Sequence, residues 1–304
     1  MGILFERKTY ILAAVGALTV CILMIIFSDI AVVSAKSSIN LWASSVLPAM
    51  LPFFICVNFM TGIGLIGFLP EGIFPFSMSV LSGYPIGAKV IGDMCRSGTV
   101  DSNEARRLMS YCSTSGPVFM IGAVGVGMLG SLTAGYVIAG SHYAGAIING
   151  IVYSIGCRRN RIKNIKERRL EEVDLMETLT VSIFSAFKSM AVILAYIIFF
   201  MFIMEVAEMS GIMQQIDSAE LRCLFKGLVE MTVGCSSLKG THFGLQLCCV
   251  LASMIVSWGG LSILGQSMSM LSGTGISFGY LALTKFTHCI FAGIIALFLG
   301  NVML

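Results

Sequence analysis

The sequence predicts an all-α polytopic membrane protein, with about seven transmembrane helices and two re-entrant hairpins arranged as an inverted repeat with broken helices. Of 304 residues, 57% are hydrophobic and 12% are charged, whereas soluble domains carry about 25% charged residues. The mean hydropathy is +0.92. Runs without Asp, Glu, Lys or Arg recur along the chain, the longest at 108–157, and about 20 apolar residues suffice to cross a bilayer. A bilayer is therefore the expected solvent.

The first expected element is a membrane anchor helix in residues 1–36. Arg7 and Lys8 precede an apolar run from Tyr10 to Phe27, an arrangement that resembles a signal peptide. The run is about 18 residues long, whereas a cleavable signal core has roughly 7–15, and no clear small-residue cleavage site follows it. We therefore expect a retained helix rather than a cleaved signal.

A basic cluster near the middle of the chain sets the expected orientation. It lies in residues 157–184, which we interpret as a cytoplasmic basic loop and an amphipathic connector, because cytoplasmic loops are enriched in Lys and Arg. Counting outward from this loop places the N-terminus inside, the C-terminus outside, and residues 28–45 and 208–226 outside. The basic residues are Arg158, Arg159, Arg161, Lys163, Lys166, Arg168 and Arg169. The expected crossings are 10–27, 46–69, two within 108–157, then 188–207, 243–258 and 278–300.

Two further stretches, 73–93 and 223–240, do not fit as crossings. Each is interrupted by Gly, Pro or Ser and is bounded by charges on one side of the membrane. We expect both to be re-entrant hairpins, which are tolerated at membrane depth only when they are buried in protein or line a wet cavity. Hairpins of this kind indicate a transport path or a binding site.

Three pairs of features recur at nearly one spacing, 143–150 residues, and indicate an internal repeat. Each copy, in residues 37–156 and 185–304, would contain a span, a hairpin, a broken helix (113–131 or 243–272) and a second span. Three crossings per copy give the second copy the opposite orientation, an architecture found in secondary transporters. Chance recurrence of Gly, Ser and Ala is the alternative. The pairs are Lys89 with Lys239, Gly116 with Gly259, and Ser141-His142 with Thr287-His288.

The motif SGYPIGAKVIGD, from Ser82 to Asp93, contains glycines and a proline that break a helix and free backbone groups for a ligand. Lys89 and Asp93 are four residues apart and can pair on one helix face. A charge at mid-bilayer costs about 2.5–3.5 kcal/mol, which favours the protein interior or an aqueous cavity for both. The alternative is a hairpin end at the cytoplasmic surface, where the Lys89 ammonium reaches water and binds nothing. The candidate substrate-binding or pathway residues are Gly83, Tyr84, Pro85, Gly87, Lys89 and Asp93.

A second motif, STSGP at 113–117, opens an apolar stretch. The start of a half-helix carries partial positive charge and free N–H groups, which favour a carboxylate or a phosphate. An anionic or polar substrate fits best. An ordinary helix start at the cytoplasmic surface, beside the amphipathic segment 101–111, is the alternative and stays open. The candidates are Ser113, Thr114, Ser115, Gly116 and Pro117.

The second half offers a matching break near Gly259 and a serine-rich hairpin end. The default role of Gly and Ser in membrane helices is close packing, so we interpret these residues as pathway candidates only as a group. His142 and His288 are either members of a proton relay or satisfied buried histidines. The candidates are Ser236, Ser237, Ser257, Gly259, Gly260 and Gln266.

Several classes of function are disfavoured by the sequence. It lacks HExxH and GxSxG motifs, so we expect no catalytic residues and no enzyme activity. The 10 cysteines include no CxxC pair, so we expect no metal site and no cofactor. A net charge of +3, concentrated in one loop, does not indicate a nucleic-acid partner. The expected partners are a small anionic substrate and the lipid bilayer, with a homo-oligomer left open.

Four segments, taken in order, carry a family resemblance. They are SGYPIGAKVIGD, the basic helix at Asn103–Arg107, STSGPVFMIGAVGVGMLGS and WGGLSILGQSMSMLSGTG. In these segments the chain resembles the sporulation integral membrane protein YlbJ family, and the resemblance covers nearly the whole length. That family is part of the wider nucleoside-recognition or Gate group, similar in architecture to concentrative nucleoside transporters and to the membrane gate of ferrous-iron transporters. The sequence contains no soluble G domain or nucleotide-binding loop, which speaks against a complete iron transporter.

The resemblance implies a protein of endospore-forming bacteria that is made in the mother cell and is needed for spore cortex formation. It also implies transport of dipicolinic acid, a small aromatic dianion, across the outer forespore membrane toward the developing spore. The leading hypothesis is therefore a multi-pass transporter of a small anionic metabolite that works by alternating access between the two repeats. A nucleoside-type carrier and a non-catalytic membrane scaffold for spore-envelope assembly are the alternatives.

Overall fold

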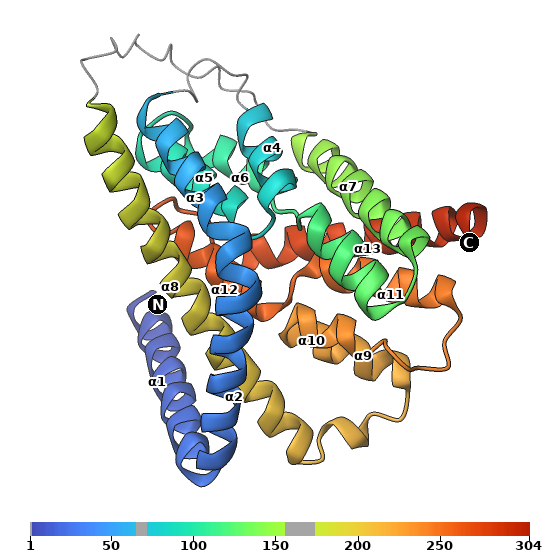
Figure 1. The fold of residues 1–304 in the computed structure, drawn as a ribbon. Coiled ribbons are helices and arrows are strands. Elements are labelled where there is room, and N and C mark those ends of the chain that lie inside the picture. The colour runs from blue at the N-terminus through green and yellow to red at the C-terminus, as the bar shows by residue number, and fades with distance from the viewer. Residues whose placement is uncertain (1, 65–71, 156–173) are drawn as a thin grey trace.

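The computed structural model describes residues 2–64, 72–155 and 174–304 (Figure 1). Those residues form helices joined by turns and loops, with no strand among them. The all-helical fold class is therefore confirmed. The basic loop predicted within 157–184 lies largely outside the described residues, which resume at Asp174.

The N-terminal region contains two helical runs that meet at a bend. α1 ends at Ile26, one position before the end of the predicted crossing 10–27, and meets the next helical run at an angle of 101°. Residues 28–45, expected as an external connection, belong to that helical run. They contain neither Gly nor Pro, so no local signal ends the helix there. The bounds are α1 Gly2–Ile26, α2 Ser28–Leu41, the π-helical η1 Trp42–Val46 and α3 Leu47–Gly62.

The long helix α8 (Leu175–Met209), with 35 residues, holds the N-terminal run in place. Asp174 caps it, because its carboxylate accepts hydrogen bonds from two backbone N–H groups of the first turn. α8 packs along α2 and α3 (Figure 1). The side-chain amide of Asn58 in α3 donates to the carbonyl of Ser182 in α8 at 3.1 Å. This buried hydrogen bond cross-links the two helices.

The first half contains two interrupted helix pairs followed by a long helix. The first predicted hairpin consists of α4 and α5, and Pro85 stands at the start of α5. The STSG residues of the second motif are non-helical, and η3, a π-helix, begins directly after Pro117. Proline suits such positions because it lacks the N–H that an upstream carbonyl would require. The bounds are α4 Ile73–Ser82, α5 Ile86–Arg96, α6 Ser102–Met109, η3 Val118–Met128 and α7 Leu132–Ser154.

The second half has the same order of elements. α9 and α10 meet at Glu230 and form the second predicted hairpin. α11 and α12 meet at Gly259, whose φ of +85° is left-handed, a conformation that glycine adopts without a Cβ clash. The bounds are η4 Met213–Gln215, α9 Ala219–Val229, α10 Met231–Ser236, α11 Leu245–Trp258, α12 Gly260–Met270 and α13 Phe278–Met303.

α7 and α13 occupy equivalent places in the two halves. Ser131 and Ser277 cap their N-termini, each accepting a hydrogen bond from a backbone N–H of the first turn. His142 in α7 and His288 in α13 are 146 positions apart and lie on equivalent turns of their helices. Their ring centroids are 4.7 Å apart. The two serine caps are separated by the same interval as the two histidines, so the correspondence extends along the helices.

The helices α7 and α13 run antiparallel to each other. Near the start of α7, a Cβ on Gly140 would lie 3.5 Å from Leu299 near the end of α13. Near the end of α7, Tyr153 meets Tyr280 edge to face, with ring centroids 5.9 Å apart, near the start of α13. Equivalent helices that run antiparallel are what an inverted repeat requires. The inversion of the complete halves stays a prediction.

Three described helical runs are long and apolar enough to cross a membrane: Leu175–Met209, Leu245–Met270 and Phe278–Met303. The bent α1–α2 pair adds a fourth if it counts as one span. The predicted count of about seven is not confirmed. Within 108–157, η3 has only 11 residues, too few to cross. α7 has 23 residues, but its hydropathy is lowered by polar side chains such as His142.

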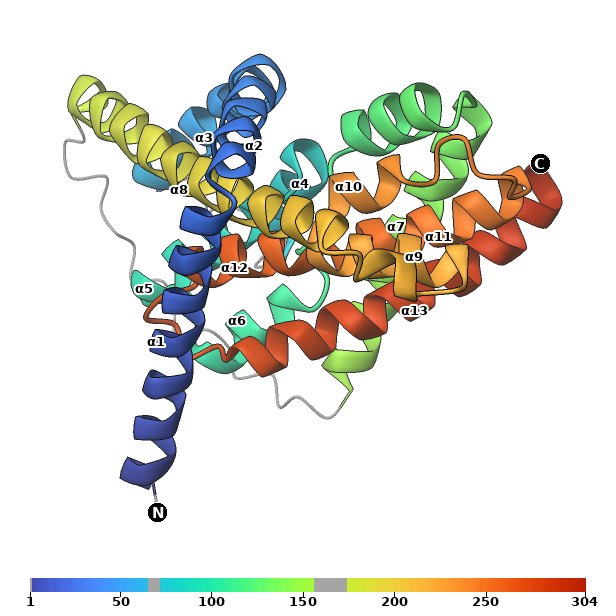
Figure 2. The same cartoon turned by 90° about the horizontal axis from the view of Figure 1, so that it is seen from below.

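Exposure separates the peripheral helices from the central ones. The most apolar stretches of α8 and α13 are only 28% and 33% buried, whereas the corresponding stretch of α11–α12 is 72% buried. The outward side chains include Phe184 and Phe187 on α8 and Phe286 and Ile290 on α13. Apolar flanks of this extent require lipid or protein rather than water. Figure 2 shows the N-terminal part of α1 projecting beyond the other helices.

Two hydrophobic clusters form the interior. One includes Phe54, Ile86 and Met190, from α3, α5 and α8. The other includes Tyr84 and Val137, together with side chains of α10 and α11. Tyr84 and Ile86 flank Pro85, so the break between α4 and α5 lies where the two clusters meet.

Candidate functional site: a buried polar network at four helix breaks

The helix breaks are in backbone contact in two pairs. A Cβ built on Gly83 would lie 2.7 Å from the backbone nitrogen of Gly116, so the α4–α5 break touches the STSGP link. A Cβ on Gly260 would lie 3.0 Å from the backbone nitrogen of Met231, so the α11–α12 break touches the α9–α10 break. Backbones approach this closely only where a Cβ is missing. Each half therefore brings its own two breaks together.

Lys285 of α13 links three of the four breaks. Its Nζ donates to the carbonyl oxygen of Ser113 at 3.1 Å and to the hydroxyl of Tyr84. Its Cε lies 3.7 Å from the Cβ position of Gly259. The side chain is deeply buried, with the residue 2% exposed. Lys285 is thus one point at which the two halves share polar contacts.

The Lys285 ammonium has only neutral neighbours. No ion pair within residues 2–64, 72–155 and 174–304 involves it. Its Nζ lies 4.1 Å from the ring centroid of Tyr84, a cation–π contact that offsets part of the lost hydration. A charged lysine at mid-bilayer costs about 2.5–3.5 kcal/mol. The network thus contains a buried lysine that has no anionic partner among the described residues.

His142 joins the breaks of the two halves through its two ring nitrogens. Nε2 accepts a hydrogen bond from the backbone N–H of Ser115 at 2.9 Å, so this nitrogen carries no proton. Nδ1 lies 2.7 Å from Oγ of Ser257, and the neutral tautomer that the Ser115 contact requires donates to it. His288 Nε2 donates to the backbone carbonyl of His142 at 2.8 Å. Both histidines are buried and hydrogen-bonded; a proton relay stays a prediction.

Side chains from neighbouring helices hold the STSGP link. The hydroxyls of Ser79 and Thr114 are 2.8 Å apart, and Ser79 Oγ also accepts from the Thr114 N–H at 3.0 Å. Tyr143 of α7 donates to the carbonyl of Ser115 at 3.0 Å. Two backbone groups of this non-helical link are thereby paired inside the protein, as irregular backbone at membrane depth requires.

Lys89 and Asp93 form the predicted pair, with 2.9 Å between Nζ and Oδ2. Asp93 also pairs with Arg96 at 2.6 Å. Arg96 in turn donates to the carbonyls of Met270 and Ser272, each at 2.9 Å. Lys89 therefore has an anionic partner within α5, which it shares with Arg96. Through Arg96 this cluster also ties α5 to the end of α12 and the loop after it.

Four predicted candidates make only local or packing contacts. A Cβ on Gly87 would overlap the carbonyl oxygen of Cys112, so Gly87 allows α5 to approach the STSGP link. The hydroxyls of Ser236 and Ser237 donate to carbonyls of their own turn. Gln266 donates to a serine hydroxyl one turn earlier at 3.2 Å. Nothing in these contacts links the four residues to Lys285 or His142.

Lys285 is not among the candidates that the sequence motifs indicate, although a signal for it exists. It is the single charged residue between Gly240 and the C-terminus, and a lone ionisable residue in a membrane segment indicates function. Its partners could not be found this way. Ser113 and Tyr84 lie 172 and 201 positions before it in the sequence.

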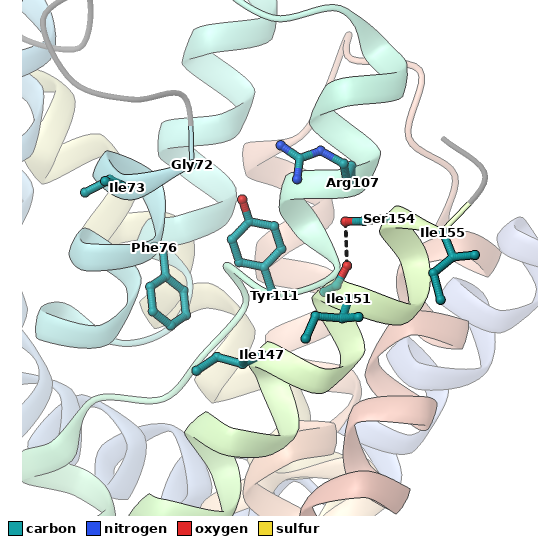
Figure 3. Close-up of a pocket in the computed structure, with 10 residues that line it drawn as sticks. Gly72, Ile73, Phe76, Arg107, Tyr111, Ile147, Ile151, Ser154 and Ile155 are labelled. Carbon is teal, nitrogen blue, oxygen red and sulfur yellow. Dashed lines mark hydrogen bonds between the residues drawn. The ribbon is translucent and has the colours of Figure 1, made fainter. Parts of the chain in front are cut away.

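A separate hollow of about 620 Å³ lies between α4, the end of α6 and the second half of α7 (Figure 3). Its wall is mostly apolar, with Ile73, Phe76 and Ile147, and Arg107 and Tyr111 supply polar groups (Figure 3). No predicted site residue lines it. The hollow is therefore distinct from the buried network. In the part of the chain that the structure describes, no cluster of three or more His, Cys, Asp or Glu residues is placed to hold a metal ion.

Apolar outer faces, interrupted half-helices and a polar network sealed inside the bundle define an integral membrane protein with discontinuous helices. The chain is 24% identical over 312 residues to the sporulation integral membrane protein YlbJ of Bacillus subtilis (strain 168), covering 88% of this chain and 76% of that protein. The predicted resemblance to the YlbJ family is thereby confirmed. No family model matches the chain, and no solved structure matches it.

Proposed function

We propose that this protein is a membrane transporter of a small anionic metabolite, acting in sporulation and without a catalytic step. The observation that carries the proposal is the contact of the helix breaks in two pairs, with three of the four breaks around one buried polar network. Unbroken helices satisfy their own backbone groups, so a plain anchor or scaffold gains nothing from these breaks. Secondary transporters use discontinuous helices to hold a substrate inside the membrane.

The relation between α7 and α13 supports alternating access as the mechanism. If the two halves are inverted copies, a pseudo-twofold axis would pass near His142 and His288, and the halves would move relative to each other about this axis. The bonds that join the halves, such as those from His142 to Ser257 and from Arg96 to Ser272, would break and re-form during the cycle.

Dipicolinic acid is the proposed substrate, moved across the outer forespore membrane for spore cortex formation. The similar Bacillus subtilis protein is named a sporulation integral membrane protein, and the family resemblance supplies the substrate. Dipicolinate is a small aromatic dianion. A buried ammonium, hydroxyl groups and half-helix N-termini are the groups that suit its carboxylates.

Uptake of labelled dipicolinate into vesicles that contain the purified full-length protein tests this proposal. We expect uptake above that of protein-free vesicles, with competition by unlabelled dipicolinate but not by uridine. Uptake of uridine instead would favour the nucleoside carrier. If the folded protein took up neither compound, the scaffold would become the better account.

A matched pair of serine variants localises the path. Ser257→Ala removes the partner of His142 Nδ1, and we expect it to reduce the initial rate of dipicolinate uptake several-fold. Ser189→Ala in α8 removes a buried hydroxyl that bonds to its own helix, at 3.0 Å from the Ser185 carbonyl, and should leave the rate unchanged. Equal rates for the two variants would place the path elsewhere.

A further inference from the structure

We infer that Lys285 is the residue that binds the carboxylate of the transported anion, the role that the sequence motif assigns to Lys89. This inference rests on the proposed function and deepens it. The ligand class is a small organic carboxylate. The third N–H of the Lys285 ammonium would form an ion pair with the carboxylate of the ligand.

The hydrogen-bonding capacity of Lys285 supports this role. A lysine ammonium carries three N–H donors, and the described structure gives its Nζ two acceptors, Tyr84 Oη and the Ser113 carbonyl. Both acceptors are neutral, so a carboxylate would add both a bond and the missing negative charge. The attraction between an ammonium and a carboxylate is also stronger in a buried site than in water. The added ion pair therefore favours an anion over a neutral ligand.

A second polar group lies beside the same break. Ser82, directly before the Gly83–Tyr84 break, is 9% exposed, and its Oγ is buried with no hydrogen-bond partner among the described residues. The backbone of Ser82 lies against Gly116, where a Cβ would come within 3.5 Å of the Ser82 carbonyl carbon. An unpartnered hydroxyl on the residue before this break is a donor suited to a carboxylate oxygen. Buried polar groups are otherwise almost always paired.

Lys89 is less suited than Lys285 to bind the carboxylate of the ligand. Its Nζ already pairs with Asp93 at 2.9 Å, and Asp93 is shared with Arg96. An arriving anion would meet a carboxylate beside that ammonium and be repelled by it. Lys285 has no such competitor among the described ion pairs.

The test compares four forms of the full-length protein: wild type, Lys285→Gln, Lys285→Arg and Lys188→Met. Lys188 is the matched control, because it is a lysine in the membrane helix α8 but is exposed. The probes are dipicolinate and its neutral diamide. The two readouts are thermal stabilisation of the detergent-purified protein by each probe, since a ligand that binds the folded state raises its melting temperature, and uptake into vesicles.

We expect dipicolinate, but not the diamide, to stabilise the wild type and Lys188→Met. Lys285→Gln should lose this stabilisation, and its uptake should fall at least about tenfold, because an ion pair in a low-dielectric site is lost. Lys285→Arg keeps the charge and should retain part of both signals. Wild-type stabilisation and uptake in a folded Lys285→Gln protein would overturn the inference.

A second variant keeps the test decisive if Lys285→Gln fails to fold. Tyr84→Phe removes one neutral acceptor from the ammonium and leaves the charge in place, so dipicolinate should stabilise this variant at least as much as the wild type. Loss of stabilisation in folded Tyr84→Phe would make the phenol the ligand group and overturn the role of Lys285.

The two proposals fail in distinguishable ways. Stabilisation that depends on Lys285, without uptake by the wild type, would support the carboxylate site and reject transport. Uptake that is equal in the wild type and Lys285→Gln would support transport and reject the site. A wild type that neither binds nor takes up dipicolinate would overturn both.

Discussion

Gly87 shows how a single residue of the SGYPIGAK motif is constrained by packing. It lies in the first turn of α5, where an added Cβ would overlap the carbonyl oxygen of Cys112 and come within 2.9 Å of the Ser79 hydroxyl. The hydroxyl can rotate away, but the carbonyl is backbone. Any side chain at position 87 must therefore push α5 away from the STSGP link.

We predict that Gly87→Ala lowers the free energy of unfolding by about 1–3 kcal/mol, the usual effect of overfilling a well-packed core. Gly122→Ala in η3 is the control, because a Cβ there would meet nothing within 4 Å. Thermal unfolding of both purified variants beside the wild type measures the difference. An unchanged melting temperature for Gly87→Ala would mean that α5 moves freely at this contact.

At the scale of elements, the α11–α12 break depends on two consecutive glycines in left-handed conformation. Gly259 has φ of +85° and Gly260 has φ of +81°. Any other L-residue would favour a right-handed continuation at this point. A Cβ on Gly260 would also lie 3.0 Å from the Val229 carbonyl oxygen in the neighbouring break. The two breaks of the second half therefore depend on each other.

We predict that Gly260→Ala reduces both stability and dipicolinate uptake. The left-handed backbone alone costs about 1–2 kcal/mol for a residue with a Cβ. Gly273→Ala is the matched control: Gly273 has φ of +80°, but a Cβ there would meet nothing within 4 Å. The control should lose similar stability and keep its uptake. If the two variants transported equally well, contact between the breaks would not matter for transport.

At the scale of the whole molecule, the peripheral and central helices have different tasks. α8 and α13 present apolar flanks outward, while α11–α12 is largely enclosed. The two hydrophobic clusters lie on either side of the Tyr84–Ile86 turn. A polar network at the junction of two clusters can change while each cluster stays packed. Each cluster contains side chains of both halves, so the clusters, rather than the two halves, are the packed units.

The predicted orientation can be tested by cysteine labelling in a variant whose native cysteines are replaced. Cytoplasmic loops are enriched in basic residues, so Lys163→Cys should resist a membrane-impermeant maleimide added from outside. Lys163 lies outside the described residues. Gln215→Cys, exposed beyond the end of α8, should be labelled from outside. The reverse labelling pattern would invert the topology.

The breaks were predictable because their causes are local. Gly83, Pro85 and Gly259 interrupt helices through their own backbone preferences, and the Lys89–Asp93 pair follows from a four-residue spacing on one helix. The continuous helical run through residues 28–45 was missed although its signal is also local, since that segment contains no Gly or Pro. The number of crossings depends on how helices tilt and pair, which a hydropathy pattern does not specify.

The sequence by itself determined that this chain is a helical membrane protein, where its helices break, and to which family it is similar. Only the tertiary structure decided which breaks touch and which lysine they surround. Lys285 meets Ser113 and Tyr84 across 172 and 201 positions, and His142 meets Ser257 across 115. Contacts at such separations arise from the packing of α7, α11 and α13 around one another, and no local preference of these residues encodes it.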